Sequence, residues 1–197
     1  MNDENAFRIV LLVLLAIMLP VGAFFRIRSQ ATRERLDRRQ EGLFVMIGLR
    51  VTALVAFVGF AAYLIEPASM RWSAMPLPDW LRWGAVVPAA AAIAVMFWAF
   101  ASLGRNLTDT VVTRREHHLV TNGPYRWVRH PLYTAWTFLF ASWCLISANW
   151  FLGAAAAVVM LFLLVRTRRE EALLIERFGD QYRAYMRTTG RFLPRIT

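Results

Sequence analysis

Two polar clusters in the second half of the chain carry the side chains that could bind or transfer a small group. One occupies residues 117–133 and holds all three histidines, and the other occupies residues 166–171 and pairs arginines with two adjacent glutamates. The apolar stretch between them, Leu132 to Val165, is too long for one membrane crossing, which needs about 20 residues. It is interrupted near Asn149, which predicts two crossings joined as a hairpin. A hairpin returns the chain to the face it left, so we expect the two clusters to meet in space.

The two clusters offer complementary partners for a zwitterionic ligand. Pro131 suits the first turn of a helix, and a helix that begins there would aim free N–H groups, able to hold a carboxylate, at the loop. Glu170 could bind an ammonium group or ribose hydroxyls. Arg166, one turn earlier on the same helix face, could pair with an anionic substrate group. S-adenosylmethionine presents groups of these kinds, but many other anionic or zwitterionic ligands would fit as well.

The composition favours a membrane protein over a soluble one. Hydrophobic residues make up 58% of the 197 residues and charged residues 18%, whereas soluble domains carry about 25% charged residues. The net charge is +10, and all 23 basic residues are arginine. Because these arginines border apolar blocks and no basic soluble module is visible, the charge indicates a membrane surface and argues against nucleic-acid binding.

The apolar blocks predict an all-α integral membrane protein with about five transmembrane helices. Two of the five form the C-terminal helical hairpin, and a cytoplasmic C-terminal helix follows it. We interpret residues 1–197 as a single membrane-embedded domain, in which residues 1–103 form three N-terminal spans and residues 104–197 form a cofactor-binding loop, the hairpin and the tail. The three N-terminal blocks are Phe7–Phe25, Leu43–Ile65 and Trp83–Leu103.

The distribution of arginine predicts the orientation. Arginines concentrate in residues 26–41, in residues 105–130 and after residue 165, whereas residues 66–82 hold only two. Five spans place the three rich segments on one side, and the positive-inside rule makes that side cytoplasmic, with the N-terminus outside. The two polar clusters then lie on the cytoplasmic side.

The tail from Arg168 to Arg187 is expected to be helical. Its large side chains recur at helical spacing and form one stripe, and Gly179 is a candidate break within it. The stripe consists of Leu174, Phe178, Tyr182 and Tyr185.

This half of the chain resembles the isoprenylcysteine carboxyl methyltransferase family and the related phospholipid N-methyltransferases. The resemblance covers roughly Leu103 to Pro194. It rests on ordered motifs, His-x-Leu-Val (117–120), Gly-x-Tyr (123–125), Arg-His-Pro-x-Tyr (129–133), Glu-Glu (170–171) and Phe-Gly-x-x-Tyr (178–182). One departure is Ala135, where many relatives have glycine, and its methyl group could narrow the helix packing or the cofactor slot.

The resemblance implies S-adenosyl-L-methionine as cofactor and methyl transfer to a lipophilic acceptor, most simply a carboxylate of the isoprenylcysteine type. It implies that Arg166 orients the substrate carboxylate. It also implies a cofactor pocket lined by His117, His118, Leu119, Val120, Tyr125, His130, Pro131, Leu132, Tyr133 and Glu170.

The acceptor class stays open at this point. A carboxylate acceptor is ionised near neutral pH and needs no general base, whereas a phospholipid amine or a small thiol needs a proton acceptor, for which His130 and Tyr133 are candidates. A sterol-reductase-like membrane reductase and a non-catalytic membrane scaffold are further alternatives. The expected partners are membrane lipids and a lipophilic small molecule or lipid-modified substrate, without nucleic acid. No metal is expected, because the His117–His118 pair has no cysteine or acidic partner at ligand spacing.

Overall fold

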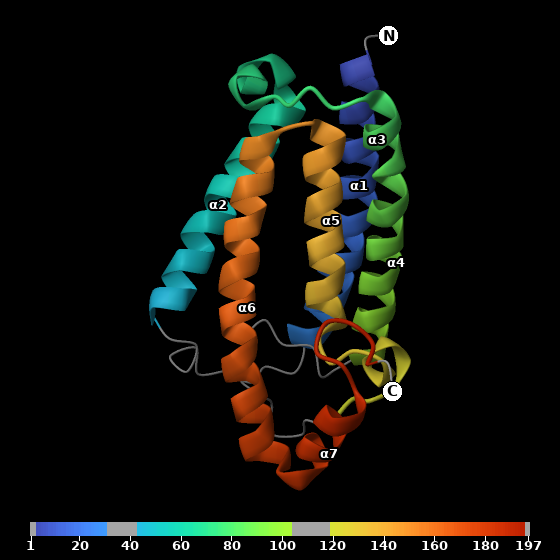
Figure 1. The fold of residues 1–197 in the computed structure, drawn as a ribbon, viewed down its shortest axis with the longest axis vertical. Helices are drawn as coiled ribbons and strands as arrows, with labels where there is room; N and C mark the ends of the chain where they lie inside the picture. Colours follow the sequence, from blue (N-terminus) through green and yellow to red (C-terminus); the bar gives the residue numbers. More distant parts are fainter. Residues whose placement is uncertain (1–2, 31–42, 104–118, 196–197) are drawn as a thin grey trace.

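The structure is a computed structural model, and it describes residues 3–30, 43–103 and 119–195. All of the regular elements in these ranges are helices (Figure 1). In chain order they are α1 (Asp3–Gln30), α2 (Leu43–Ile65), η2 (Pro67–Ser73), α3 (Asp79–Gly84), α4 (Val86–Leu103), η4 (Gly123–Arg126), α5 (Pro131–Ser147), α6 (Trp150–Phe178) and α7 (Asp180–Thr188).

The predicted all-α membrane fold is confirmed. Four segments of the described chain are long and apolar enough to cross a membrane, namely Glu4–Phe25, Phe44–Ile65, Asp79–Leu103 and Trp150–Phe178. The remaining long helix, α5, has 17 residues, a length of about 26 Å, which is slightly less than the ~30 Å hydrocarbon core. A count of five crossings therefore stays a prediction that depends on α5.

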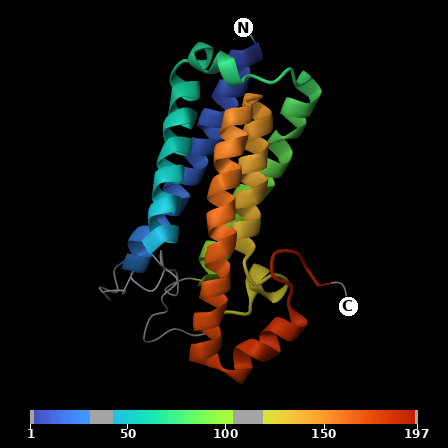
Figure 2. The ribbon, with the colours of Figure 1, turned by 60° about the vertical axis from the view of Figure 1, so that its left-hand side comes forward.

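The predicted hairpin is present, and α5 and α6 lie side by side (Figures 1 and 2). Helix α5 ends where Ala148 adopts a left-handed conformation with φ 45°. Asn149 then caps α6, because its side chain accepts a hydrogen bond from the Leu152 backbone N–H at 3.1 Å. The break near Asn149 that the sequence predicts thus separates two antiparallel helices.

The second arm of the hairpin is longer than the sequence predicted. We expected an arm that ends near Val165 and a separate tail helix from Arg168 to Arg187, whereas α6 continues without interruption to Phe178. Gly179, with φ 54°, separates α6 from α7, as its position suggested. The polar cluster at residues 166–171 therefore lies on a rigid extension of the membrane helix itself.

The end of the bundle opposite the polar clusters is fixed by two hydrogen-bonded clamps. The Asn149 side chain donates to the Met70 carbonyl and to Ser73 Oγ, which ties the hairpin turn to η2. Buried Arg82 binds both carboxylate oxygens of Glu4 at 2.9 and 3.1 Å and donates through Nε to the Ile146 carbonyl. These contacts tie α1, α3 and α5 together at this end of the bundle.

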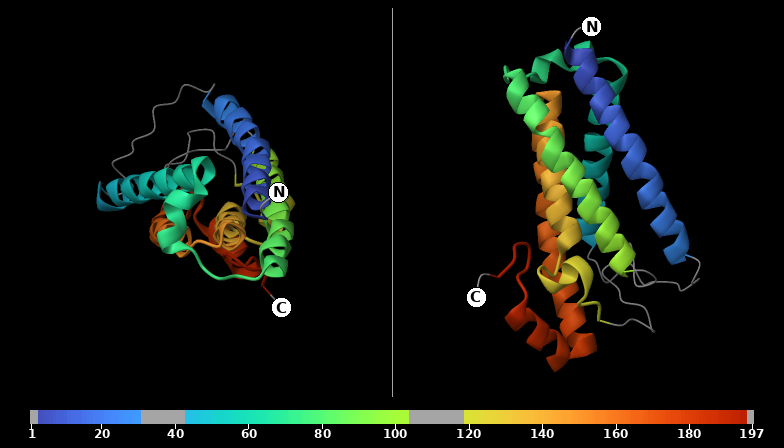
Figure 3. Two further views of the ribbon diagram at one scale, coloured as in Figure 1. Left: turned by 90° about the horizontal axis from the view of Figure 1, so that it is seen from above. Right: turned by 90° about the vertical axis from the view of Figure 1, so that its right-hand side faces the viewer.

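The buried core lies mainly between α1, α4 and α5, and α2 packs chiefly on α6 and diverges from α1 (Figure 3). Ala135 is 2% exposed and belongs to this core. Its methyl group therefore packs in the buried interface between the helices. Between α1, α2, α5 and α6 is an almost wholly apolar cavity of about 440 Å³, whose α5 wall is formed by Trp136, Phe140, Trp143 and Cys144.

Candidate cofactor and substrate site

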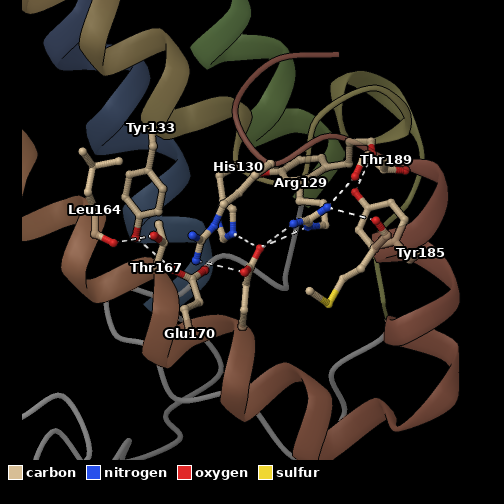
Figure 4. Close-up of polar contacts among 12 residues, drawn as sticks. Arg129, His130, Tyr133, Leu164, Thr167, Glu170, Tyr185 and Thr189 are labelled. Carbon is tan, nitrogen blue, oxygen red and sulfur yellow. Dashed lines mark hydrogen bonds and ion pairs between the residues drawn. The ribbon is translucent and has the colours of Figure 1, made fainter. Parts of the chain in front are cut away.

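The hairpin brings the two polar clusters together. The Tyr133 hydroxyl on the first turn of α5 donates a hydrogen bond to Glu170 Oε2 on α6 at 2.9 Å, across 37 residues of sequence (Figure 4). Pro131 occupies the first turn of α5 as expected and is almost fully buried. The start of α5 and the extension of α6 thus form one site.

Glu171 is the most highly connected acidic residue of this site. Its Oε1 atom accepts from Arg129 Nε at 3.0 Å and lies 3.2 Å from His130 Nε2. Its Oε2 atom lies 2.9 Å from Arg191 Nη2. A carboxylate with two guanidinium partners is ionised and can only accept, so the contact with His130 requires a proton on Nε2 of the ring.

The C-terminal segment 189–192, which we call the strap, is hydrogen-bonded across the loop that precedes α5. The backbone N–H groups of Arg129 and His130 donate to the carbonyls of Gly190 and Arg191 at 2.8 and 3.0 Å. Thr134 Oγ1 donates to the Phe192 carbonyl at 2.7 Å. Backbone hydrogen bonds thus join the strap to this loop and to the first turn of α5.

Aromatic packing and side-chain hydrogen bonds join the strap and α7 to the same loop. The His130 ring lies between the rings of Tyr133 and Phe192, with centroid distances of 5.5 and 5.8 Å. Arg129 donates to the backbone carbonyl of Thr189 (Figure 4). Burial raises the pKa of Tyr185 to about 12, so its hydroxyl keeps the proton that it donates to the Tyr125 carbonyl.

Of the predicted cofactor pocket, the structure brings together Tyr133, Glu170 and His130, through the hydrogen bond between Tyr133 and Glu170 and the packing of His130 on Tyr133. Tyr125 and His130 are buried, while Leu119, Val120, Leu132 and Tyr133 are partly buried. Arg166 is partly buried on α6, one turn before Glu170. His117 and His118 lie outside the described residues. Within the described chain, no group of three or more His, Cys, Asp or Glu residues is arranged to hold a metal ion.

Sequence reasoning missed two residues of the site. It selected Glu170 from the Glu-Glu pair and gave Glu171 no role, although Glu171 contacts Arg129, His130 and Arg191. Arg191 carries no motif and lies 20 residues beyond Glu171, so only the fold of the tail reveals it. The Glu-Glu pair itself was a usable signal for Glu171, because adjacent helix positions project in different directions and can serve different partners.

The sequence profile of the isoprenylcysteine carboxyl methyltransferase (ICMT) family matches residues 85–176. Human protein-S-isoprenylcysteine O-methyltransferase is 34% identical over 101 residues, which cover 50% of this chain and 36% of that protein. The chain thus matches about a third of the length of this relative. Methanethiol S-methyltransferase of Mycobacterium tuberculosis is 37% identical over 70 residues, which cover 36% of this chain and 28% of that protein.

The fold matches a solved structure of the eukaryotic intramembrane Ras methyltransferase ICMT. The TM-score is 0.53 at 24% sequence identity, and the match covers 74% of this chain and 51% of that one. The likeness extends beyond the profile match and supports the same membrane-embedded fold. At this identity the likeness shows the fold alone, while the profile match and the curated relatives show that residues 85–176 are similar to the isoprenylcysteine carboxyl methyltransferase family.

Proposed function

We propose that the protein is an S-adenosyl-L-methionine-dependent methyltransferase that acts on a lipophilic acceptor, with a carboxylate of the isoprenylcysteine type as the first choice. The observation that carries this proposal is the hydrogen bond between Tyr133 and Glu170. It joins the two clusters that the family motifs mark, and an apolar cavity lies farther along α5 and α6, toward the hairpin turn. Trp136 lines that cavity and lies three residues after Tyr133, a rise of about 4.5 Å along α5.

The chemistry of the donor set fits the proposed cofactor. S-adenosylmethionine supplies an electrophilic methyl group on a sulfonium sulfur. Glu170 would bind its ammonium group or ribose hydroxyls, and Tyr133 would hold the Glu170 carboxylate in place through the 2.9 Å hydrogen bond. Leu119, Val120 and the buried ring of Tyr125 offer apolar contacts for an adenine base.

The acceptor would be held by charge at one end and by apolar packing at the other. Arg166 would fix the acceptor carboxylate in line with the methyl group, which needs alignment and loss of water but no general base. The hydrocarbon part of the acceptor would enter the cavity from the bilayer, between α1 and α2, which diverge. Because both ends belong to one continuous bundle, we treat residues 1–197 as a single domain.

The orientation is part of the proposal. The site would face the cytoplasm and the N-terminus would lie outside, because the arginine-rich segments flank the site end of α4, α5 and α6. The partners would be membrane lipids and a small lipophilic or lipid-modified acceptor.

A thiol acceptor is the second candidate, and the His130 contact favours it. The Glu171 carboxylate holds the proton on His130 Nε2, which leaves the other ring nitrogen as a proton acceptor of the kind that a thiol would need. Similarity to methanethiol S-methyltransferases supports the same candidate. The carboxylate acceptor remains the first choice, because it is ionised near neutral pH and needs no proton acceptor.

Ligand binding by the purified protein in detergent tests the proposal. S-adenosylmethionine and S-adenosylhomocysteine should raise the melting temperature in proportion to the logarithm of their concentration. Incubation with methyl-labelled donor and N-acetyl-S-farnesylcysteine should give a labelled, base-labile methyl ester, whereas methanethiol should give a volatile product if the thiol reading is correct.

Three variants give this experiment its controls. Glu170→Ala should abolish the ligand-induced shift, while Glu176→Ala, an exposed glutamate on the same helix, should leave it unchanged. Arg166→Ala should abolish ester formation but retain donor binding. Stabilisation by a reduced nicotinamide cofactor instead would indicate a reductase, and no response to either ligand would indicate a scaffold.

A further inference from the structure

The position of Arg191 in the strap suggests a role in ligand binding that the family motifs do not include. Its Nη2 atom pairs with Glu171 Oε2 at 2.9 Å, and its backbone carbonyl accepts from the His130 N–H. Phe192, the next residue, packs on the His130 ring, whose other neighbour Tyr133 binds Glu170. Arg191 therefore lies within the same junction as the predicted cofactor pocket.

Arg191 retains hydrogen-bonding capacity in this position. Its Nε atom is buried and has no hydrogen-bond partner within the described part of the chain. The ion pair with Glu171 thus leaves part of the hydrogen-bond donor capacity of the guanidinium group unused. The side chain as a whole is 31% exposed, so a ligand can reach the rest of the guanidinium group.

The charges around Arg191 favour an anionic ligand. Glu171 carries one negative charge and has two guanidinium partners, Arg129 and Arg191. Among the described residues, this cluster therefore has an excess of one positive charge. Glu170, one residue away on α6, has the neutral Tyr133 hydroxyl as its hydrogen-bond partner. The junction thus presents one positive and one negative site side by side, a pattern that suits a zwitterion.

We propose that Arg191 binds a ligand carboxylate with its free guanidinium edge, and that the strap is part of the binding site. The inference rests on the proposed function. Two carboxylates could occupy this position, the amino-acid carboxylate of the methyl donor and the carboxylate of the acceptor. Either carboxylate would form charge-assisted hydrogen bonds with the accessible N–H groups of the guanidinium group.

Arg191→Gln removes this charge and keeps a side chain of similar polarity. The strap should stay in place, since its hydrogen bonds to Arg129, His130 and Thr134 come from the backbone. The test measures dissociation constants for two donor analogues. S-adenosylhomocysteine has the carboxylate, whereas methylthioadenosine lacks the amino-acid end. Two acceptor analogues, N-acetyl-S-farnesylcysteine and its carboxamide, complete the set.

If Arg191 binds the donor carboxylate, Arg191→Gln should weaken S-adenosylhomocysteine binding by about tenfold or more and leave methylthioadenosine binding unchanged. If it binds the acceptor carboxylate, the same loss should appear for N-acetyl-S-farnesylcysteine and not for its carboxamide. Arg191→Lys should restore part of the affinity, and Arg187→Gln, an exposed arginine on α7, should match the wild type.

For each pair of ligands, the dissociation constant of the ligand with the carboxylate is divided by that of the ligand without it. The inference is overturned if Arg191→Gln leaves both of these ratios at the wild-type value. That outcome includes an equal loss of affinity for all four ligands, which would mean that Arg191 only stabilises the strap. Failure of the proposed function gives a different result, because the wild-type protein itself would then bind none of these ligands.

Discussion

The Tyr133 hydroxyl and the Glu170 carboxylate meet at 2.9 Å although 37 residues and two antiparallel helices separate them in the chain. Each residue is rigidly placed, Tyr133 on the first turn of α5 and Glu170 on the extension of α6. A contact of this kind orients the carboxylate before any ligand arrives, which lowers the entropic cost of binding.

Tyr133→Phe should weaken S-adenosylhomocysteine binding by roughly tenfold, because a hydrogen bond to a charged group contributes about 1.5–3 kcal/mol. Titration calorimetry or thermal shift in detergent measures the change. Tyr63→Phe is the matched control, since Tyr63 donates to Glu4 at the other end of the bundle and its loss should affect stability but not affinity. Equal affinities for wild type and Tyr133→Phe would show that Glu170 needs no such support.

Glu171→Gln should destabilise the protein strongly, because it leaves the Arg129 and Arg191 guanidinium groups without their ionised partner. The side chains of Arg129 and Glu171 are 9% and 10% exposed, and breaking a buried ion pair costs about 3–5 kcal/mol. The melting temperature should fall. Glu176→Gln, at an exposed position on the same helix, is the control, and a Glu171→Gln protein as stable as this control would contradict the assigned role.

Hydropathy and helix signals were sufficient to predict the long apolar helices and the hairpin, but not the continuation of α6 to Phe178. The block Leu43–Ile65 coincides with α2, and the polar break near Asn149 falls between α5 and α6. Long apolar runs predict spans reliably because the backbone must satisfy its own hydrogen bonds in lipid. The meeting of Tyr133 and Glu170 followed from the hairpin alone.

Contacts that depend on tertiary structure could not be predicted in this way. Arg82 reads as one of two arginines in a sparsely charged segment, but it is 7% exposed because Glu4, 78 residues away, neutralises it. The strap has no periodicity and binds the loop by backbone hydrogen bonds, which any sequence could form. The roles of Glu170 and Glu171 depend on which of the two side chains projects from α6 toward His130. The sequence of two adjacent glutamates does not determine this.

Gly153 allows the close approach of α5 and α6 near the hairpin turn. A Cβ atom at this position would lie 2.4 Å from Cys144 Sγ, so Gly153→Ala should lower the stability by about 1–3 kcal/mol through overpacking. Cys144→Ala in the same protein removes the sulfur and should restore most of the loss. Gly84→Ala is the control, because nothing lies within 4 Å of its Cβ position. A Gly153→Ala melting temperature equal to that of Gly84→Ala would exclude the clash.

The apolar cavity should determine how long an acceptor chain the protein accepts. Ala156 lines the cavity, and the adjacent Ala157 is exposed on the outer face of α6, so Ala156→Phe fills the cavity while Ala157→Phe adds the same ring outside it. We expect the new ring at position 156 to displace two methylene groups of a bound chain from the cavity. Burial of each methylene group contributes about 0.8 kcal/mol, so this loss corresponds to roughly a tenfold rise in KM for a farnesylated acceptor. A short-chain acceptor should lose nothing, and donor affinity should stay constant in both variants. Should Ala156→Phe and Ala157→Phe give the same KM for long and short acceptors, the hydrocarbon chain does not occupy this cavity, and the acceptor must reach Tyr133 and Glu170 by another route.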